Sequence, residues 1–432
     1  MSTATSLREE VTALLQALLR ADTVNPPGNE TRAALVLQDY LASNGIESRL
    51  VARGPERANL IARLPGGDGP SLGFLCHTDT VVADPSEWQR DPWSGDLVDG
   101  EVWGRGALDM KSQVAAGAVA LASLAREGRT LDGDRLFIAT ADEEVGDGFG
   151  LEWLVQAHPD LVRIDYAINE GGGERVRLAD SVYYFCGTAE KMSAAFRLRV
   201  RGRSGHASMP AIADNALVKA AGMIETLGAL RVPPAIVPEV RKFFEVVVGE
   251  VPVAEDALEC ARARLGAGAV EIVEPLLGAT FAPTMIEASQ ARNVIPARCD
   301  VTVDCRLLPE QAPEDIVPLL RAALGSGDWE IEWIERVGGT RSSFETPLWK
   351  AIEAYVAELE PEARLLPSCN AGFTDSHYLR EAFGTVAYGF FPMRAMEPEL
   401  VARLEHSADE RVPVDDLELG VDALRQAALA LL

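Results

Sequence analysis

Short apolar runs alternate with amphipathic stretches over the first 188 residues, and the same pattern returns after about residue 340. The runs have the length of buried strands. Between them, residues 111–128 show the alanine content and spacing of a helix that ends at a glycine. Alternating strands and helices of this kind predict an α/β layer fold. The expected strands cover residues 58–64, 72–76, 135–140, 166–169 and 385–391.

Residues 189–339 show a different pattern. Apolar and basic side chains alternate strictly over residues 193–202, as in a strand with one exposed face. The elements that follow have the order β-α-β-β-α-β, which suits a small two-layer α+β, ferredoxin-like domain, with residues 232–280 as a helical elaboration. We therefore expect a discontinuous larger domain of residues 1–188 and 340–432, with residues 189–339 as an inserted domain.

The composition narrows the class of partner. Of the 432 residues, 47% are hydrophobic and 25% are charged, and no apolar run approaches the ~18 residues of a membrane span. The formal net charge of −26 argues against nucleic acid or an anionic membrane, because both require a clustered basic surface. The N-terminus lacks the features of a secretory signal, and Ser6 with Glu9 has the spacing of a helix capping box. We expect a cytoplasmic protein whose six scattered cysteines are free thiols.

Polar side chains follow three of the expected strands at the points where those strands end. His77 and Asp79 follow residues 72–76. The adjacent glutamates at 143 and 144 come directly after the strand at 135–140, and Glu170 follows the strand at 166–169. In open α/β sheets, ligands bind beyond the carboxyl ends of the strands. These side chains are therefore candidates for one shared site.

Two further residues extend this candidate site. Asp109 lies in "GRGALDMK", a glycine-marked turn before a helix, and His406 lies in "EHSADE" near the C-terminus. Two imidazoles and several carboxylates form a nitrogen- and oxygen-rich donor set that suits zinc, or less specifically manganese or cobalt. Each cluster alone has an ordinary explanation, such as a polar strand end, an acidic turn or a helix N-cap at Asp109. Together they favour a metal site.

The charge of the candidate ligands favours two metal ions over one. Two neutral histidines and three carboxylates carry a net charge of −3. One divalent ion would leave −1, whereas two ions with a bridging hydroxide sum to zero, and a buried site near neutrality costs less free energy. We expect two ions about 3.5–4 Å apart, bridged by one carboxylate. The residues counted are His77, Asp109, Glu144, Glu170 and His406.

The remaining acidic residues of these clusters suit other roles. Neighbouring side chains diverge along the chain, so Glu143 and Glu144 do not easily bind the same ion. One of the two remains free to act as a base toward metal-bound water. Asp79 is suited to accept a hydrogen bond from His77 and so to fix the tautomer of that imidazole.

Six motifs in order carry a resemblance to a known family. They read "CHTDT", "GRGALDMK", "ADEEVG", "NEGGG", "GRSGHASMP" and "HSADERV", and the early "VNPPGNE" is similar too. Over essentially the whole chain, the sequence resembles the M20 family of metallopeptidases and deacylases, the group of acetylornithine deacetylase, succinyl-diaminopimelate desuccinylase, aminoacylase-1 and glutamate carboxypeptidase. The resemblance implies a zinc-exopeptidase-like catalytic domain, with a mixed sheet flanked by helices.

The resemblance also implies roles for individual residues. Glu143 becomes the general base, and Asp79 the residue that orients His77. The five metal ligands divide between two zinc ions. The implied sets are His77, Asp109 and Glu170 around one ion, and Asp109, Glu144 and His406 around the other.

For residues 189–339, the resemblance implies a lid that mediates homodimerisation. His206 of one subunit would reach the active site of the other and stabilise the oxyanion. Asn293 and Arg306 match positions that contact substrate, and Arg306 is expected to hold a carboxylate, a task that suits the geometry of a guanidinium group. From the residues alone, Arg306 has a simpler explanation as an ion-pair partner of a neighbouring aspartate.

One motif departs from the pattern of the family. Where relatives often show Gly-Gly-Thr-Asp, this chain has Ala371-Gly-Phe-Thr-Asp-Ser376. Thr374 is still expected to contact substrate, but Phe373 replaces a glycine nearby. The side-chain preference of a relative therefore does not carry over to this chain.

These inferences predict a metal-dependent hydrolase with two divalent ions, most simply Zn²⁺, with Co²⁺ or Mn²⁺ as alternatives. Its expected substrate is an N-acyl amino acid or a short peptide with a free carboxylate, cleaved at the amide bond by metal-activated water. One alternative is an exopeptidase that acts on dipeptides or C-terminal residues. Another is a binding protein of the same fold without turnover, which the presence of Glu143 disfavours.

Overall fold

The computed structural model describes residues 6–178, 180–289 and 291–431. The chain forms two compact units. Unit 1 comprises Met1–Thr188, Ser342–Ser368 and Thr374–Leu432, and unit 2 comprises Ala189–Arg341 and Cys369–Phe373.

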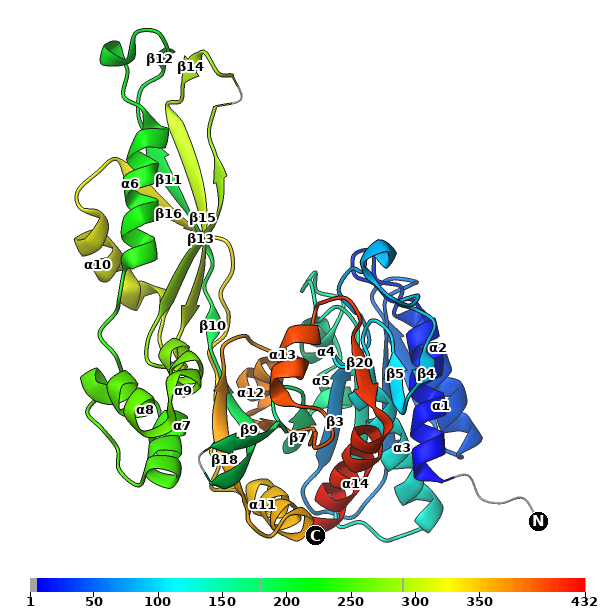
Figure 1. Cartoon of the computed structure of the whole chain (residues 1–432). Coiled ribbons are helices and arrows are strands. Elements are labelled where there is room, and N and C mark those ends of the chain that lie inside the picture. Colours follow the sequence, from blue (N-terminus) through cyan, green and yellow to red (C-terminus); the bar gives the residue numbers. More distant parts are fainter. Residues whose placement is uncertain (1–5, 179, 290, 432) are drawn as a thin grey trace. The chain divides into compact units, whose positions relative to one another are not determined.

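Within the described residues, nine strands of unit 1 form one mixed sheet, in the order β1-β2-β6-β3-β7-β19-β9-β18, with β8 paired to β9. Figure 1 labels four of these strands, β3, β7, β9 and β18. The strands β6, β3, β7 and β19 run parallel, and β1, β2 and β9 pair antiparallel with their neighbours. The bounds are β1 Ser48–Ala52, β2 Ala58–Leu64, β3 Leu72–His77, β6 Arg135–Thr140, β7 Tyr166–Asn169, β8 Arg175–Leu178, β9 Ser181–Glu190, β18 Ala363–Asn370 and β19 Val386–Gly389.

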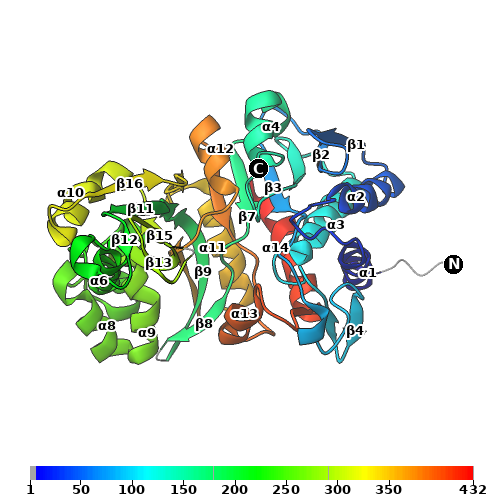
Figure 2. The ribbon, with the colours of Figure 1, turned by 90° about the horizontal axis from the view of Figure 1, so that it is seen from above.

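Helices cover both faces of this sheet (Figure 2). Along β3, Phe74 and Cys76 belong to the core under α1, α3 and α14, while Leu75 belongs to the core under α4, α5 and α12. Buried side chains on both faces explain why the central strands read as continuous apolar runs. The helices are α1 Leu7–Arg20, α2 Thr31–Ser43, α3 Lys111–Glu127, α4 Leu151–Ala157, α5 Pro159–Val162, α11 Pro347–Leu359, α12 Ser376–Phe383, α13 Pro398–Leu404 and α14 Val414–Ala430.

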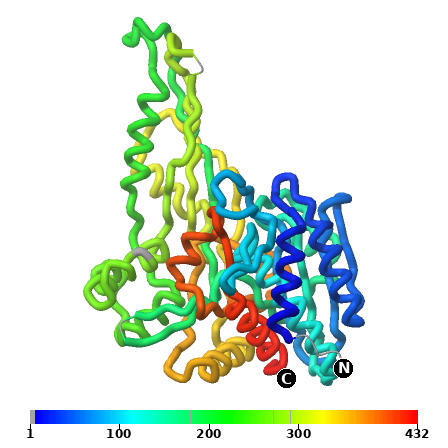
Figure 3. The backbone as a smooth tube through the Cα atoms, turned by 45° about the vertical axis from the view of Figure 1, so that its right-hand side comes forward, coloured from blue at the N-terminus to red at the C-terminus, as the bar shows by residue number. Residues whose placement is uncertain are grey.

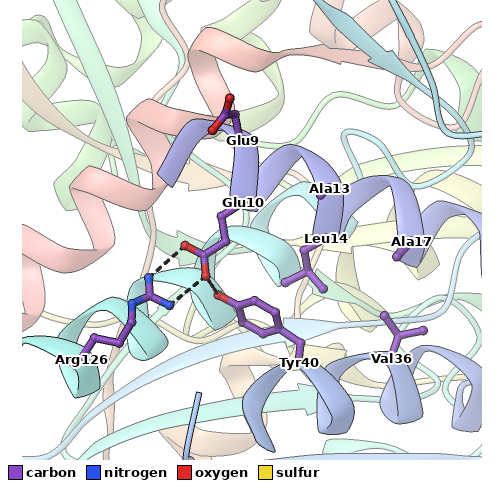
Figure 4. A pocket seen from close by; sticks show the side chains of 8 residues that line it. All are labelled: Glu9, Glu10, Ala13, Leu14, Ala17, Val36, Tyr40 and Arg126. Carbon is purple, nitrogen blue, oxygen red and sulfur yellow. Dashed lines mark hydrogen bonds and ion pairs between the residues drawn. The ribbon is translucent and has the colours of Figure 1, made fainter. Parts of the chain in front are cut away.

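The first and last helices pack against each other, as the blue and red ends of the tube show (Figure 3). The capping box expected at Ser6 and Glu9 begins α1. Glu10 of α1 also accepts hydrogen bonds from Tyr40 of α2 (2.7 Å) and Arg126 of α3 (2.8 and 2.9 Å), which ties three helices together (Figure 4). A second, three-stranded sheet of unit 1 has the order β20-β5-β4. Its strands are β4 Asp96–Val98, β5 Glu101–Trp103 and β20 Arg411–Pro413.

Unit 2 is built on an antiparallel sheet with the strand order β16-β11-β15-β13, extended by the short strands β10 and β17. The helices α6 and α10 cover one face. On the other face, Arg199 of β11 contacts Glu330 and Glu332 of β16, as the alternating sequence predicts. The strands are β10 Met192–Ser193, β11 Phe196–Arg201, β12 Gly205–His206, β13 Thr280–Glu287, β14 Val294–Ile295, β15 Arg298–Leu307, β16 Trp329–Trp333 and β17 Val337–Gly338. The helices are α6 Ala216–Ala229, α7 Pro238–Phe243, α8 Ala257–Leu265, α9 Ala267–Val273 and α10 Pro313–Leu324.

The cysteines and the helices bear on two expectations from the composition. All six cysteines are free, and five of them are buried. In the described part of the chain, no helix combines the length and the apolar composition that crossing a bilayer requires.

Candidate active site

The parallel strands β3, β6 and β7 bring their following residues to one edge of the unit 1 sheet. His77 is the last residue of β3, and it pairs with Thr140 at the end of β6. Glu143 follows β6, and Glu170 follows β7. Ligand atoms of His77, Glu143 and Glu170 all lie within 4.8 Å of one another, and those of His77, Asp109 and Glu144 do so as well. The structure therefore brings together the clusters that sequence reasoning placed at strand ends.

Asp109 lies between the two histidines. Its Oδ1 is 3.0 Å from Nε2 of His77, and its Oδ2 is 2.8 Å from Nε2 of His406. The Oε2 of Glu170 is 3.6 Å from Nε2 of His77, and the Oε2 of Glu144 is 3.4 Å from Nε2 of His406. Asp109 thus lies near both histidines, and each histidine has one further carboxylate neighbour. Asp109 does not cap the helix that follows, since α3 begins without a side-chain cap.

The pKa values reflect this crowding of acidic groups. Burial raises the pKa of Glu170 to about 7, although His77 lowers it. Hydrogen bonds with Asp109 and Glu144 raise the pKa of His406 to about 10. Burial favours the neutral form of Asp109, yet the two histidines hold the pKa of Asp109 below its usual range. Carboxylates held this closely favour bound protons or bound cations.

The donor set fits divalent metal ions. Two imidazole nitrogens and three carboxylates are available, and zinc, cobalt and manganese all accept such ligands. Within the described residues, the buried Oε1 of Glu144 has no hydrogen-bond partner, so it is available to a ligand. A buried carboxylate oxygen without a partner is costly unless a cation binds it.

Asp79 fixes both the histidine and the loop that carries the two glutamates. Nδ1 of His77 lies 3.1 Å from the main-chain oxygen of Asp79 and 3.4 Å from its Oδ1. The carboxylate of Asp79 accepts the backbone N–H groups of Glu143 (3.2 Å) and Glu144 (3.1 Å). The side chain is fully buried, and the pKa of Asp79 falls below its usual value, because contacts with His77 outweigh the effect of burial.

An ion-pair network that was not predicted from the sequence supports the loop that carries Glu143 and Glu144. Arg57 makes a two-pronged contact with Glu30 (2.6 and 2.8 Å) and a third contact with Asp142 (2.9 Å). Asn25 donates to both Asp142 (3.1 Å) and Asp79 (3.0 Å). The available signal was "VNPPGNE", which contains Asn25 and Glu30, but its spacing does not reveal the arginine partner.

Glycines after Glu170 allow strand ends to approach closely. A Cβ atom at Gly172 would lie 2.4 Å from the backbone oxygen of Gly389, and one at Gly173 would lie 2.0 Å from that of Phe391. Gly173 also has a φ of +113°, which favours glycine. Close packing against Gly389 and Phe391 therefore requires glycine at positions 172 and 173 of the "NEGGG" motif.

The remaining expected site residues fall in other places. Thr374 is buried in unit 1, and its Oγ1 accepts a hydrogen bond from the N–H of Ser376 (3.2 Å). His206 and Asn293 are neighbours in unit 2, where the N–H of Ala207 donates to the backbone oxygen of Asn293 (2.9 Å). Their roles remain predictions.

Arg306 lies on β15 of unit 2, where it pairs with Asp304 through two contacts (2.9 and 3.0 Å). This is the ion pair that the residues alone suggested. A substrate role for Arg306 would require its guanidinium to exchange or share this partner.

Comparisons with known proteins connect this chain to one family of peptidases. The sequence model of peptidase family M20/M25/M40 matches residues 73–430. Succinyl-diaminopimelate desuccinylase of Methylobacterium sp. (strain 4-46) is 28% identical over 417 residues, which are 94% of this chain and 92% of that protein.

Solved structures share the fold. The M20 family metallo-carboxypeptidase Sso-CP2 from Sulfolobus solfataricus has a TM-score of 0.72 at 19% identity, covering 98% of this chain and 99% of that one. The Bacillus subtilis YXEP protein, described as a dinuclear metal binding peptidase from the M20 family, has a TM-score of 0.65 at 13% identity and covers 99% and 98%.

The family match extends over most of the chain and includes every candidate metal ligand. The resemblance seen in the six sequence motifs is confirmed. The chain belongs to peptidase family M20/M25/M40, and it is a hydrolase that acts on amide bonds.

Proposed function

We propose that this enzyme is a dizinc amidohydrolase that cleaves N-acyl amino acids or short peptides with a free carboxylate. The observation that carries the proposal is the position of Asp109, with one oxygen at His77 and the other at His406. Each histidine has its own further carboxylate neighbour, Glu170 or Glu144. A carboxylate shared by two such groups suits a pair of bridged ions.

The residues divide naturally between the two ions. His77, Asp109 and Glu170 would hold one, and Asp109, Glu144 and His406 would hold the other, with Co²⁺ or Mn²⁺ as alternatives to Zn²⁺. When bound, the ions would supply Lewis acidity that polarises the substrate carbonyl and makes water more acidic. The Bacillus subtilis neighbour is described as a dinuclear metal binding peptidase, which supports this count.

Glu143 is the residue that would move the proton. Its backbone is held by Asp79, and its side chain lies with His77 and Glu170. Burial and the charge of Glu170 raise the pKa of Glu143 well above its usual value. A carboxylate of raised pKa can accept a proton from the attacking water and return it to the departing amine.

The test of this role is Glu143→Gln. We expect the variant to keep its metal, measured by elemental analysis, and to lose turnover about 10²–10⁴-fold, the usual contribution of a general base. Glu47→Gln, at an exposed residue before β1, is the matched control and should retain full activity. Wild-type turnover in Glu143→Gln would refute the mechanism, and a wild-type protein that binds no divalent ion would refute the proposed function.

Two reactions fit the proposed function, deacylation of N-acyl amino acids and exopeptidase cleavage of short peptides. The relative from Methylobacterium is a succinyl-diaminopimelate desuccinylase, and the structural neighbour from Sulfolobus solfataricus is a metallo-carboxypeptidase. A panel of N-acetyl and N-succinyl amino acids and of dipeptides, each assayed with zinc, cobalt and manganese, would separate the two. Arg306, Asn293 and Thr374 are the proposed contacts to the substrate.

The geometry of unit 2 favours the prediction that it is a lid that forms a homodimer. Arg306 lies near one end of β15, whereas His206 and Asn293 lie beyond the other end, at Arg298. Eight residues of strand span roughly 27 Å, so one copy of unit 2 does not bring both groups to one small substrate. The exposed strand β13, with Met285 60% exposed, offers an edge at which copies could pair.

A mixing experiment with the Glu143→Gln variant tests whether His206 acts in the active site of the partner subunit. Glu143→Gln and His206→Ala proteins, dissociated and reassociated together, should regain activity, because a hybrid dimer contains one complete site. No recovery in hybrids, verified by differently tagged subunits, would place His206 outside the neighbouring active site.

A further inference from the structure

Glu410 is a fully buried carboxylate that the mechanism above does not use. It lies four residues after His406 and immediately before β20. Its Oε1 accepts the backbone N–H groups of Leu108 (2.6 Å) and Asp109 (3.1 Å). Its Oε2 accepts the N–H of Gly106 (3.0 Å) and an Nη1–H of Arg105 (2.7 Å).

These four donors lie on the loop that carries Asp109. The contact is therefore between the loop that supplies one metal ligand and the loop that supplies another. The backbone strengthens the same junction, since the N–H of Gly104 donates to the main-chain oxygen of Glu410 (3.0 Å). The pairing of β5 with β20 begins at Trp103 and Arg411, directly beside it.

The chemistry of this contact fits an ionised carboxylate. A carboxylate has about four acceptor positions, and all four are used here by N–H donors. Arg105, which is 4% exposed, balances the buried charge. Because every partner is a donor, an amide in place of the carboxylate would turn an NH₂ group toward N–H groups.

We propose that Glu410 is a positioning residue for the metal centre. By accepting the N–H of Asp109, it sets the orientation of the residue that lies between His77 and His406. By joining two loops, it also sets where His406 stands relative to Asp109, whose Oδ2 is 2.8 Å away. This inference rests on the proposed function, because it assigns Glu410 a role in holding the metal ligands.

The test compares Glu410→Gln with a matched buried acid. Asp416 on α14 is also buried, and it accepts the backbone N–H groups of Arg394 (2.8 Å), Ala395 (2.8 Å) and Met396 (3.0 Å). No candidate ligand is among these donors. Asp416→Asn should therefore reproduce the general cost of removing a buried carboxylate without disturbing the metal centre.

Metal-free protein is titrated with Co²⁺, and binding is followed by visible absorption and by elemental analysis. We expect Glu410→Gln to bind Co²⁺ about 10–100-fold more weakly than wild type, the usual effect of losing a group that supports metal ligands. Asp416→Asn should stay within about twofold of wild type, while thermal unfolding shows that both variants are folded. Glu410→Asp, which keeps the charge beside Arg105 but is shorter, serves if Glu410→Gln does not fold, and should also bind more weakly.

The outcomes separate the two claims. Wild-type Co²⁺ affinity in the folded Glu410 variant would overturn the positioning role, and so would an equal loss in Asp416→Asn. Failure of the wild-type protein to bind Co²⁺ would instead overturn the proposed function.

Discussion

The two histidines of the candidate site are held in contrasting ways. His77 is the last residue of β3, is 2% exposed, and sits against Asp79. His406 lies in a loop between α13 and β20, has a φ of +56°, and its side chain is 53% exposed. The first belongs to the sheet, whereas the second depends on how a surface loop is held.

The candidate site therefore has two halves, and a different kind of contact fixes the backbone in each of them. In the strand half, formed by His77, Asp79 and Glu170, pairing of parallel strands and a core on both faces fix the backbone. In the loop half, formed by Asp109 and His406, irregular backbone is held by the buried carboxylate of Glu410. Loops with exposed side chains open locally more easily than core strands.

The largest expected effect is on the free energy of unfolding, through the network that supports the loop of Glu143 and Glu144 beside the strand half. Arg57→Leu leaves Glu30 and Asp142 buried without their cation. Removing one partner of a buried ion pair costs about 3–5 kcal/mol of the free energy of unfolding, which denaturant titration would measure. Arg8→Leu removes a surface pair with Asp415 and should cost about 0–1 kcal/mol. Equal costs would show that the buried network of Arg57, Glu30 and Asp142 stabilises the protein no more than a surface ion pair does.

In metal-free protein, substitutions of the two histidines should change the free energy of unfolding by different, smaller amounts. His77→Ala removes a partner from buried Asp79 and should cost about 1–3 kcal/mol of unfolding free energy. His406→Ala, at an exposed position, should cost within about 0.5 kcal/mol. Each variant should also lose one of the two bound ions, counted by elemental analysis. Equal destabilisation by both substitutions would break the contrast between the halves.

The smallest effect concerns how metal affinity depends on pH. In metal-free protein, the pKa of Glu170 is raised to about 7 and that of His406 to about 10. A ligand below its pKa carries a proton that the metal displaces, so affinity rises with pH, about tenfold per unit for each proton released. Between pH 7 and 8.5, His406→Ala should show a slope shallower by about one proton than wild type, measured by chelator competition. An unchanged slope would mean that His406 binds no ion.

Local features of the fold were predictable from the sequence. The run at 72–76 became β3, and the stretch at 111–128 became α3, which ends at Gly128 in the left-handed conformation. Both depend on side-chain periodicity and on glycine, which act over a few residues. The strand expected at 385–391 is shorter: β19 ends at Gly389, and beyond it Phe391 donates to the backbone oxygen of Gly172 and Met393 to that of Gly173.

Contacts between distant loops were not predictable in the same way. The residues that follow strands could be grouped, because parallel strands end at one edge. Glu410 belongs to the "HSADERV" motif, yet nothing in its neighbourhood indicates that its partners lie about 300 positions earlier, around Asp109. Arg57 likewise reaches Asp142 across 85 positions of the chain. Such pairings depend on how loops meet in space, and a single sequence records only their composition.

The glycines after Glu170 have a consequence for engineering new specificity. Residues that border a reactive centre are usual targets for randomised libraries, and Gly172 and Gly173 stand next to a candidate ligand. Any side chain there would collide with the main chain of Gly389 or Phe391. Most members of such a library would be lost to misfolding before any substrate could select among them, so diversity is better introduced elsewhere.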